Sequence, residues 1–184
     1  MTRKENLNAV FSATFCLLII CFVVTLAVAG TRFIFKDRIA EQEWLEKQTV
    51  MSQLIAADSY QEIGETDEYQ IYQALDQAGD SIGYIFVTAA YGYGSEVSVM
   101  TGISEGKVTA VDILDCSNET PGLGQNVAKD SFKNQFKELP STPVITKTEA
   151  KAPDEIQAVT GATKTSNAVA QAVTTALELY EELP

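Results

Sequence analysis

The sequence predicts an α+β protein in which an N-terminal transmembrane helix precedes one domain with an antiparallel sheet flanked by helices. Three observations predict this class. An uncharged apolar run lies near the N-terminus, three neighbouring β-rich runs are joined by short turns, and the chain ends in an amphipathic helical pattern. With 184 residues, the chain has room for one membrane anchor and one modest domain.

The apolar run covers Ala9–Ala29, 21 consecutive positions without a charge. At the helical rise per residue, a run of this length spans about 30 Å, the thickness of the hydrocarbon core of a bilayer. Because Ala27-Val28-Ala29 also fits a signal-peptidase site, a cleaved signal peptide is the alternative. The run is longer than the usual signal core of about 7–15 residues, which favours an uncleaved anchor.

The orientation of this anchor does not follow from its flanking charges, because basic residues lie on both sides of the run. These residues are Arg3 and Lys4 before it, and Arg32, Lys36 and Arg38 after it.

A membrane-proximal region follows the anchor. Asp37–Ala57 has helical character, because its apolar residues keep roughly to one face. Asp58–Asp80 is polar and acidic, which predicts a connecting region. The predicted organisation is therefore an anchor over 1–30, a membrane-proximal helix and connecting region over 31–80, and one domain over 81–184.

Three β-rich runs, Ile82–Ala90, Glu96–Ile103 and Lys107–Leu114, predict an antiparallel meander. The first two are joined by Tyr91-Gly92-Tyr93-Gly94, and the last two by Glu105-Gly106, a tight hairpin signal. The third run has apolar residues on both parities, which predicts a strand covered on both faces.

The C-terminal part of the chain is predicted to supply helices around this sheet. Ala128–Leu139 is amphipathic, with Phe132 and Phe136 four positions apart, and Val144-Ile145-Thr146 predicts a further short strand. Ser166–Glu182 predicts the last helix, whose apolar stripe consists of Ala170, Val173, Leu177 and Tyr180.

The composition excludes several classes of function. A net charge of −12 argues against a nucleic-acid binder. The absence of histidine excludes Ser–His or Cys–His catalytic pairs and histidine metal ligands. The three cysteines, Cys16, Cys21 and Cys116, are too few for a four-cysteine cluster. We therefore predict no catalytic residue and no metal ligand, so any redox chemistry needs an organic cofactor.

The stretch Val159–Asn167, VTGATKTSN, is chemically the most unusual part of the chain. Gly161 and Ala162 leave its backbone open to close approach by a bulky group. Its hydroxyl-bearing residues lie at the N-terminus of the last predicted helix, where free backbone N–H groups and the helix dipole favour an anion, phosphate above all. An ordinary helix N-cap is the alternative interpretation. These hydroxyl-bearing residues are Thr160, Thr163, Thr165 and Ser166.

A second loop, Asn118–Gly124 (NETPGLG), contains a proline and two glycines. Paired with VTGATKTS behind a membrane anchor, it resembles the FMN-binding domain family. Members of that family include the G subunits of Rnf electron-transport complexes and the C subunits of Na+-translocating NADH:quinone reductases. The segment Gly92–Gly124 is similar to the family's core sheet and flavin loop, and the resemblance covers roughly Ile82 to Leu183.

The resemblance implies that FMN is joined through its phosphate to the threonine that ends an (S/T)GAT motif, a phosphoester installed by a dedicated flavin transferase. The matching residue is Thr163, and Thr160, Gly161 and Ala162 match the rest of the motif. Where the family usually has an aspartate, six residues before the modified threonine, this sequence has Gln157, with Asp154 three residues earlier.

The resemblance also implies that Glu119 and Thr120 lie near the isoalloxazine ring and that Leu123 and Gly124 shape its pocket. Backbone N–H groups at Gly122 and Gly124 can approach the ring edge, because glycine has no side chain. The predicted FMN site comprises Thr163 as the covalent attachment, together with Thr160, Gly161, Ala162, Lys164, Thr165, Glu119, Thr120, Gly122, Leu123, Gly124 and Tyr93.

Several of these residues also have ordinary interpretations that the sequence leaves open. Lys164 can offset the phosphate charge or be a solvated lysine. Tyr91 and Tyr93 can border the ring or pack at a β-turn. Glu119 can tune the ring's potential or accept a proton, or it can be an exposed loop acid. Cys116 is left out of the site, because one buried cysteine more often packs than reacts.

By resemblance, the chain is expected to be an electron-transfer subunit of an ion-translocating Rnf-type ferredoxin:NAD oxidoreductase complex in the cytoplasmic membrane, with its flavin domain on the outer face. It is not expected to turn over NADH by itself, because no G-x-G-x-x-G motif precedes a helix. Its expected partners are the other subunits, the membrane and the flavin transferase. The alternatives are a flavinylated quinone-reductase subunit, a standalone flavin-bearing reductase or sensor, and a non-redox envelope protein.

Overall fold

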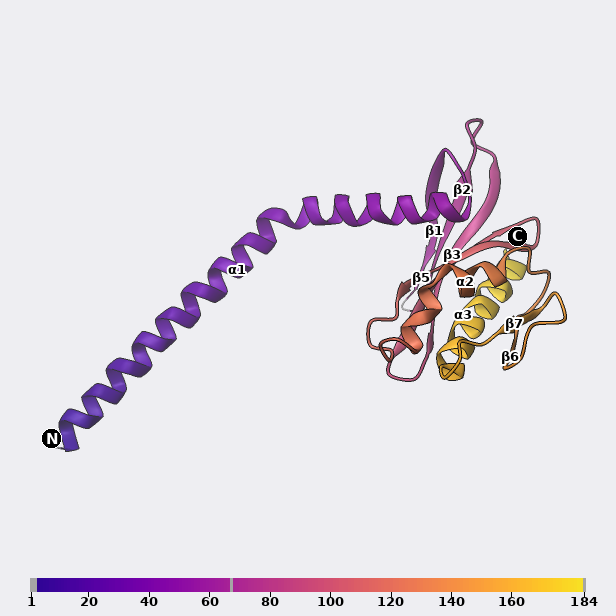
Figure 1. The fold of residues 1–184 in the computed structure, drawn as a ribbon. Coiled ribbons are helices and arrows are strands. Elements are labelled where there is room, and N and C mark those ends of the chain that lie inside the picture. Colours follow the sequence, from indigo (N-terminus) through magenta and orange to yellow (C-terminus); the bar gives the residue numbers. More distant parts are fainter. Residues whose placement is uncertain (1–2, 67, 184) are drawn as a thin grey trace. The chain divides into compact units, whose positions relative to one another are not determined.

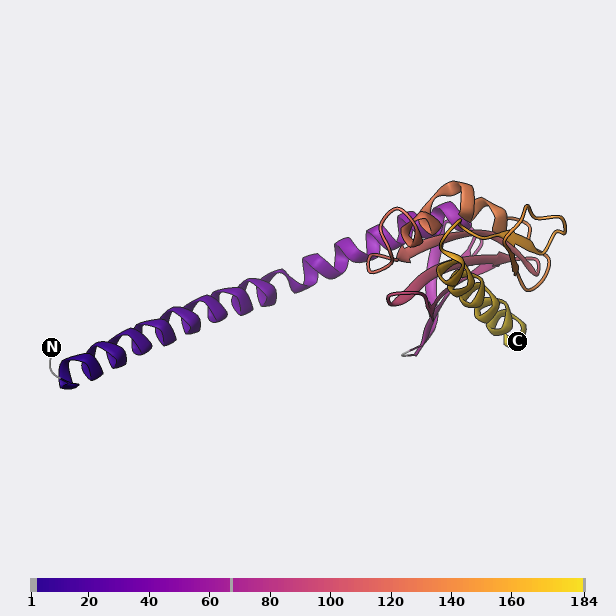
Figure 2. The same ribbon diagram turned by 60° about the horizontal axis from the view of Figure 1, so that its bottom comes forward.

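The structure is a computed structural model that describes residues 3–66 and 68–183. In its first helix, the side chains of residues 3–12, 37, 40 and 43 are outside the described set. The chain divides into two compact units, Met1–Glu46 and Lys47–Pro184. Figures 1 and 2 show the second unit as a twisted sheet with helices packed on it.

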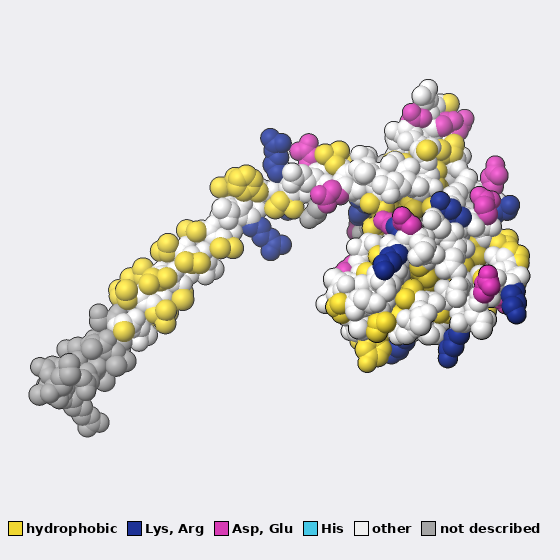
Figure 3. All heavy atoms as spheres, in the orientation of Figure 1, with side chains coloured by type: hydrophobic (Ala, Val, Ile, Leu, Met, Phe, Trp, Pro, Cys, Tyr) yellow, Lys and Arg dark blue, Asp and Glu magenta, His cyan; other side chains and the backbone are white. Residues whose placement is uncertain are grey.

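The first unit is helical, as predicted. Helix α1 runs over Arg3–Leu54, and its stretch Ala13–Lys36 is the one segment of the described chain that is long and apolar enough to cross a membrane. Figure 3 shows hydrophobic side chains along this stretch. The stretch extends beyond the predicted end at Ala29, because three more apolar residues, 33–35, continue it. Positions 9–12 of the predicted span, and Arg3 and Lys4, lie outside the described side chains.

The predicted membrane-proximal helix is the C-terminal part of α1 and not a separate element. No proline occurs between residues 3 and 54, so nothing in the sequence removes a backbone donor from the helix. The last turns belong to the second unit, where Met51 and Leu54 are buried, as is Ile55 just after the helix. The helix end is therefore part of the core of the domain.

The second unit is built on a five-stranded antiparallel sheet with its strands in chain order. The predicted meander is confirmed by its last three strands. Glu105 and Gly106 join two of them with φ angles of 53° and 74°, as a two-residue hairpin turn requires. The strands are β1 (Ser59–Glu65), β2 (Tyr69–Leu75), β3 (Ser81–Tyr91), β4 (Glu96–Ser104) and β5 (Lys107–Asp115).

The predicted connecting region over residues 58–80 was wrong, because β1 and β2 occupy it. β1 is the edge strand and is exposed along most of its length, so it carries polar residues with little hydrophobic alternation. β2 contributes Ile71, Tyr72 and Ala74 to the buried core, and glutamines flank and interrupt this set in the sequence. The strand signal was therefore present but diluted by polar residues.

Helices cover both faces of this sheet. Helix α3 (Thr163–Glu182) packs against β3 and β4, and its residues Ala172, Val173 and Ala176 are fully buried. The end of α1 covers the other face, where a Cβ added at Gly102 would meet Leu54 at 3.1 Å. Three hydrogen bonds tie this end to the sheet: Thr109 Oγ1 to the Leu54 carbonyl at 2.8 Å, and Lys47 Nζ to Gln70 Oε1 and Tyr72 Oη, both at 3.1 Å.

The predicted single helix over Ala128–Leu139 is not continuous. The range begins with the last residue of η1 (Gly124–Ala128) and contains two short elements, α2 (Asp130–Lys133) and η2 (Asn134–Phe136). The chain turns away from helical geometry at Glu138, with φ 58°, so that Leu139 can bridge to Val108 of β5. Phe132 and Phe136 are buried as predicted, with ring centroids 5.5 Å apart.

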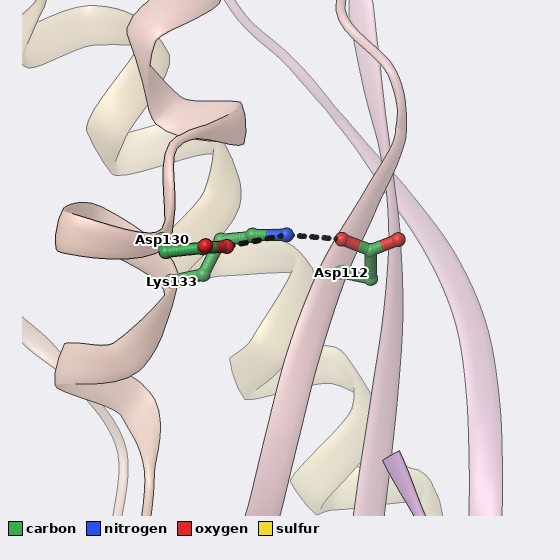
Figure 4. Close-up of polar contacts among 3 residues, drawn as sticks. All are labelled: Asp112, Asp130 and Lys133. Carbon is green, nitrogen blue, oxygen red and sulfur yellow. Dashed lines mark hydrogen bonds and ion pairs between the residues drawn. The ribbon is translucent and has the colours of Figure 1, made fainter. Parts of the chain in front are cut away.

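A small ion-pair cluster fixes α2 to the sheet. Lys133 Nζ lies 2.6 Å from Asp112 Oδ1 on β5 and 3.3 Å from Asp130 Oδ1 (Figure 4). Burial lowers the pKa of Lys133, but its hydrogen bonds and charge contacts with the two aspartates outweigh this effect and raise it overall.

The strand predicted at residues 144–146 is β6 (Val144–Thr146), and it pairs in parallel with β7 (Glu155–Gln157).

Candidate functional site

A cavity of about 350 Å³ lies beside the first turn of α3. Its walls come from the β3–β4 turn, the loop after β5 and the start of α3. All of its lining residues are members of the predicted flavin site: Tyr93, Thr120, Leu123, Gly124, Gly161, Ala162, Lys164 and Thr165. The structure therefore brings together three segments that are far apart in the sequence.

Thr163 is the first residue of α3, which begins three residues earlier than predicted. It is half-buried and lies between two lining residues, Ala162 and Lys164. The N-cap, Ala162, has no side chain that can cap the helix, and the backbone N–H groups of residues 163–165 donate to no described residue. A hydroxyl and three N–H groups are thus available to an anion at the helix N-terminus.

The turn before α3 is held by Ser166, which is fully buried. Its Oγ accepts a hydrogen bond from the Val159 N–H at 3.0 Å and donates one to the Ala162 carbonyl at 3.0 Å. Gly161 takes a φ of 80°, where a side chain would be strained. Two of the four hydroxyl-bearing residues expected at this helix start, Thr165 and Ser166, are therefore buried and hydrogen-bonded within the protein. Their hydroxyl groups are not free to bind an anion.

Four predicted site residues do not line this cavity: Thr163, which lies between two lining residues, and Glu119, Thr160 and Gly122. Gly122 has a φ of 74° and forms the turn that presents Leu123. Thr160 is exposed and lines a second crevice of about 400 Å³ that also contains Gln157. The remaining residues of that crevice are Asn126, Lys129, Ser131, Phe132, Gln135, Ala158 and Val159.

Glu119 lies behind the cavity wall and not in it. Its side chain is 1% exposed, so the alternative of an exposed loop acid was wrong. Oε1 accepts hydrogen bonds from three successive backbone N–H groups, those of Tyr93 and Gly94 at 2.9 Å and Ser95 at 3.3 Å. Oε2 accepts one from Thr165 Oγ1 at 2.5 Å. The carboxylate therefore joins the β3–β4 turn to the first turn of α3.

The ionisation of Glu119 follows from these contacts. Burial raises the pKa of the carboxyl group, but the hydrogen bonds from Thr165, Gly94, Ser95 and Tyr93 outweigh burial, and the pKa lies below its ordinary value. The pKa of the half-buried Cys116 thiol is raised. Burial is the larger cause, and the negative charges of Asp115 and Glu119 add to it.

Close packing around Glu119 explains three glycines that the sequence interpretation did not use for this purpose. A Cβ added at Gly92 would lie 2.6 Å from Glu119 Oε1, and one at Gly124 would lie 2.9 Å from Oε2. At Gly94 the added Cβ would collide with the Asn118 carbonyl. The Gly-Tyr-Gly pattern at 92–94 was the available signal for this close approach, and it was interpreted only as a strand connection.

The mouth of the cavity is formed by side chains that reach into solvent. Tyr93 is 69% exposed and Leu123 is 43% exposed. Lys164 Nζ lies 6.0 Å from the centre of the Tyr93 ring, at the limit of a cation–π contact. Tyr91 is also exposed but is not among the lining residues.

These features fit a flavin phosphate. The volume falls within the range of about 300–1,000 Å³ that is typical of small-molecule sites, and tyrosine, leucine and glycine border it. The uncapped first turn of α3 suits a phosphate group. No group of three histidine, cysteine, aspartate or glutamate side chains among the described residues is arranged to hold a metal ion.

Comparisons with known proteins agree with this geometry. Residues 92–178 match the family model of the FMN-binding domain. The G subunit of the proton-translocating ferredoxin:NAD(+) oxidoreductase complex of Clostridium ljungdahlii is 32% identical over 97% of this chain and 95% of the relative. The G subunit of the Na(+)-translocating ferredoxin:NAD(+) oxidoreductase complex of Acetobacterium woodii is also 32% identical, over 100% of this chain and 99% of the relative.

The fold is shared with a solved structure of lower identity. The C subunit of the Na(+)-translocating NADH-quinone reductase from Parabacteroides distasonis superposes with a TM-score of 0.52 at 22% identity. The superposition covers 62% of this chain and 61% of that one. The match to the two G subunits extends over nearly their full lengths, so it covers more of the chain than the match to the C subunit does. The chain therefore belongs to the family of G subunits of ion-translocating ferredoxin:NAD(+) oxidoreductase complexes, and it has that family's FMN-binding domain.

Proposed function

We propose that this chain carries FMN covalently on Thr163 and transfers electrons within a membrane-bound, ion-translocating ferredoxin:NAD(+) oxidoreductase complex. The observation that carries the proposal is the position of Thr163. It starts α3 between two residues that line the cavity, and its hydroxyl has no hydrogen-bond partner among the described residues. An ester at this hydroxyl puts the phosphate at the helix N-terminus and leaves the ring within reach of the cavity.

The attachment is a substitution at phosphorus. Thr163 Oγ forms the new bond and loses its proton, and the bond to the leaving group of an activated flavin phosphate breaks. The resulting diester keeps one negative charge, which the free N–H groups of the first turn and Lys164 can offset. The chain has no histidine, and Glu119 already accepts four hydrogen bonds, so we expect the transferase to supply the base.

Once attached, the flavin performs the redox chemistry, and the protein supplies its position and electrostatic surroundings. The names of the two G-subunit relatives describe complexes that couple ferredoxin and NAD(+) to ion translocation, and this supports a role for the chain as a carrier between redox centres. The apolar stretch Ala13–Lys36 supports attachment to the membrane. We place the flavin domain on the outer face of the membrane, where protease added to spheroplasts or protoplasts should digest it.

Intact mass spectrometry and in-gel flavin fluorescence test the attachment on protein co-expressed with its flavin transferase. Wild-type protein is expected to gain the mass of FMN less water and to fluoresce after denaturation. Thr163→Ala is expected to lose both signals. Thr142→Ala is the matched control, because it removes the hydroxyl of an exposed threonine that lies outside the motif and does not line the cavity.

The proposal is wrong if Thr163→Ala still carries the adduct. A wild-type protein without an adduct would direct attention to Gln157, and Gln157→Asp tests whether an acid at that position restores it. Failure of both proteins to take up flavin would favour the envelope-protein interpretation, in which the motif only begins a helix.

A further inference from the structure

Glu119 is in direct contact with two residues that line the cavity, Thr165 and Gly124. Its Oε2 accepts the hydrogen bond of Thr165, which lines the cavity. Gly124 also lines the cavity, and a Cβ added there would lie 2.9 Å from the same oxygen and 2.9 Å from Glu119 Cβ. The absence of a side chain at Gly124 thus lets the carboxylate approach the wall closely.

The charge of this carboxylate is not neutralised by a cation. All four of its hydrogen-bond donors are neutral groups, three backbone N–H groups and one hydroxyl. The ion pairs found among the described residues do not include Glu119. Lys164, the basic residue at the cavity, extends over the Tyr93 ring instead. The other titratable groups on the surrounding segments are Tyr93, Glu96, Asp115 and Cys116.

The hydrogen bonds also favour the charged form. A carboxylate with several donors aimed at it is stabilised relative to the protonated acid, because a protonated carboxyl would turn one acceptor into a competing donor. The lowered pKa of Glu119 agrees with this arrangement. The carboxylate is therefore negatively charged near neutral pH.

We propose that Glu119 is a positioning residue that fixes Tyr93 at the cavity mouth and whose negative charge lowers the reduction potential of the bound flavin. The proposal rests on the proposed function, since it requires FMN in the cavity. Full reduction adds two electrons to a flavin, and when one proton accompanies them the ring gains one negative charge. A nearby fixed negative charge disfavours that gain, and burial strengthens the effect because the local dielectric is low.

The test is Glu119→Gln in the flavin-loaded full chain. Glutamine keeps the volume and one carbonyl oxygen for the three N–H groups, and its amide can donate to Thr165 Oγ1, so the charge is the main property removed. Glu105→Gln is the matched control, because Glu105 is exposed and follows the opposite end of β4. Spectroelectrochemical titration is expected to show a more positive midpoint potential for Glu119→Gln and an unchanged one for Glu105→Gln.

A second readout does not depend on flavin. In the Thr163→Ala background, the unfolding free energy is measured from pH 7 to pH 3 with and without Glu119→Gln. Because the folded pKa of Glu119 is depressed, its contribution to stability is present above about pH 4.5 and is lost as the pH falls through the folded value. Glu119→Gln is expected to reduce this fall of the unfolding free energy at acid pH, which we call the acid limb. Glu105→Gln is expected to leave it unchanged.

An unchanged midpoint potential in a flavin-loaded Glu119→Gln protein overturns the proposal, as does an unchanged acid limb. A wild-type protein without flavin contradicts the proposed function but not the fixed charge, which the acid titration tests alone. If Glu119→Gln does not fold, Thr165→Val serves instead. Removing the Thr165 donor raises the pKa of Glu119, so the acid limb should move to higher pH, and an unmoved limb contradicts the proposal.

Discussion

Five polar or charged side chains are buried among the described residues, and four of them are hydrogen-bonded. Glu119, Thr165 and Ser166 belong to the site and hold its three segments together. Thr88 lies in the core and donates from Oγ1 to the Ala172 carbonyl of α3 at 2.9 Å. Thr101 is fully buried, and its Oγ1 has no partner among the described residues. The two buried threonine hydroxyls of the sheet therefore contribute differently to the stability of the domain, since one is hydrogen-bonded and the other is not.

We expect Thr101→Val to stabilise the domain by about 1 kcal/mol, because it removes an unsatisfied buried hydroxyl without changing the shape of the side chain. Thr88→Val is the matched control on the neighbouring strand, and it should destabilise the domain by about 1 kcal/mol because it leaves the Ala172 carbonyl with one bond fewer. Urea unfolding of both variants measures the difference. Equal changes of the same sign in the two unfolding free energies would contradict the difference in hydrogen bonding between Thr101 and Thr88.

At the residue scale, the sequence predicted all the lining residues of the cavity, because the two motifs that contain most of them resemble those of a known family. It did not predict the burial of Glu119. That burial depends on the turn at residues 93–95, which is more than twenty positions away in the sequence. A glutamate in a loop has no local feature that distinguishes a solvated carboxylate from one bound by a distant turn.

At the scale of elements, regular hydrophobic patterns were sufficient for β3, β4, β5, β6 and α3. The pattern missed the strands β2 and β7. It also failed at β1, which is a polar edge strand, and at residues 128–139, where the two phenylalanines pack as predicted but the backbone is not one helix. In both places a contact with another element decides the backbone. β1 is fixed by pairing with β2, and the η2 region by the bridge to Val108.

The end of α1 gives the sharpest test at this scale. Leu54 is 6% exposed and packs over Gly102, so Leu54→Ala should cost about 2–5 kcal/mol of stability by leaving a cavity between helix and sheet. Gln53→Ala, one position earlier and exposed, should change stability by less than about 0.5 kcal/mol. Denaturant unfolding of the two variants measures this contrast. A Leu54→Ala protein as stable as Gln53→Ala would show that the helix end is not part of the core.

The whole molecule combines a membrane-length helix with a domain that starts at residue 47 and whose first buried hydrophobic residue is Met51. The sequence placed the start of the domain at residue 81, because polar residues weaken the local strand patterns of β1 and β2 and no local pattern indicates the packing of Met51, Leu54 and Ile55. These contacts join residues that are tens of positions apart, so no local window contains them. The second unit is correspondingly larger than the matched family region at 92–178.

We expect a fragment that starts at Lys47 to fold as the second unit of the chain. A fragment that starts at Ala56 lacks three buried side chains and should be destabilised by several kcal/mol, because each buried aliphatic side chain contributes about 1.5–3 kcal/mol. Circular dichroism with thermal unfolding compares the two. A cooperative transition at the same temperature in both fragments would contradict the assignment of the helix end to the domain.

The depressed pKa of Glu119 has a consequence for measurements of proton stoichiometry. The chain has no histidine, the one side chain whose unperturbed pKa lies between pH 5 and 8, and burial with nearby charges raises the pKa of Cys116 further above that interval. The carboxylate beside the cavity is also already ionised there. Near pH 6 to 7, the slope of potential against pH should therefore count the protons that the flavin itself takes up, with little contribution from the side chains around it.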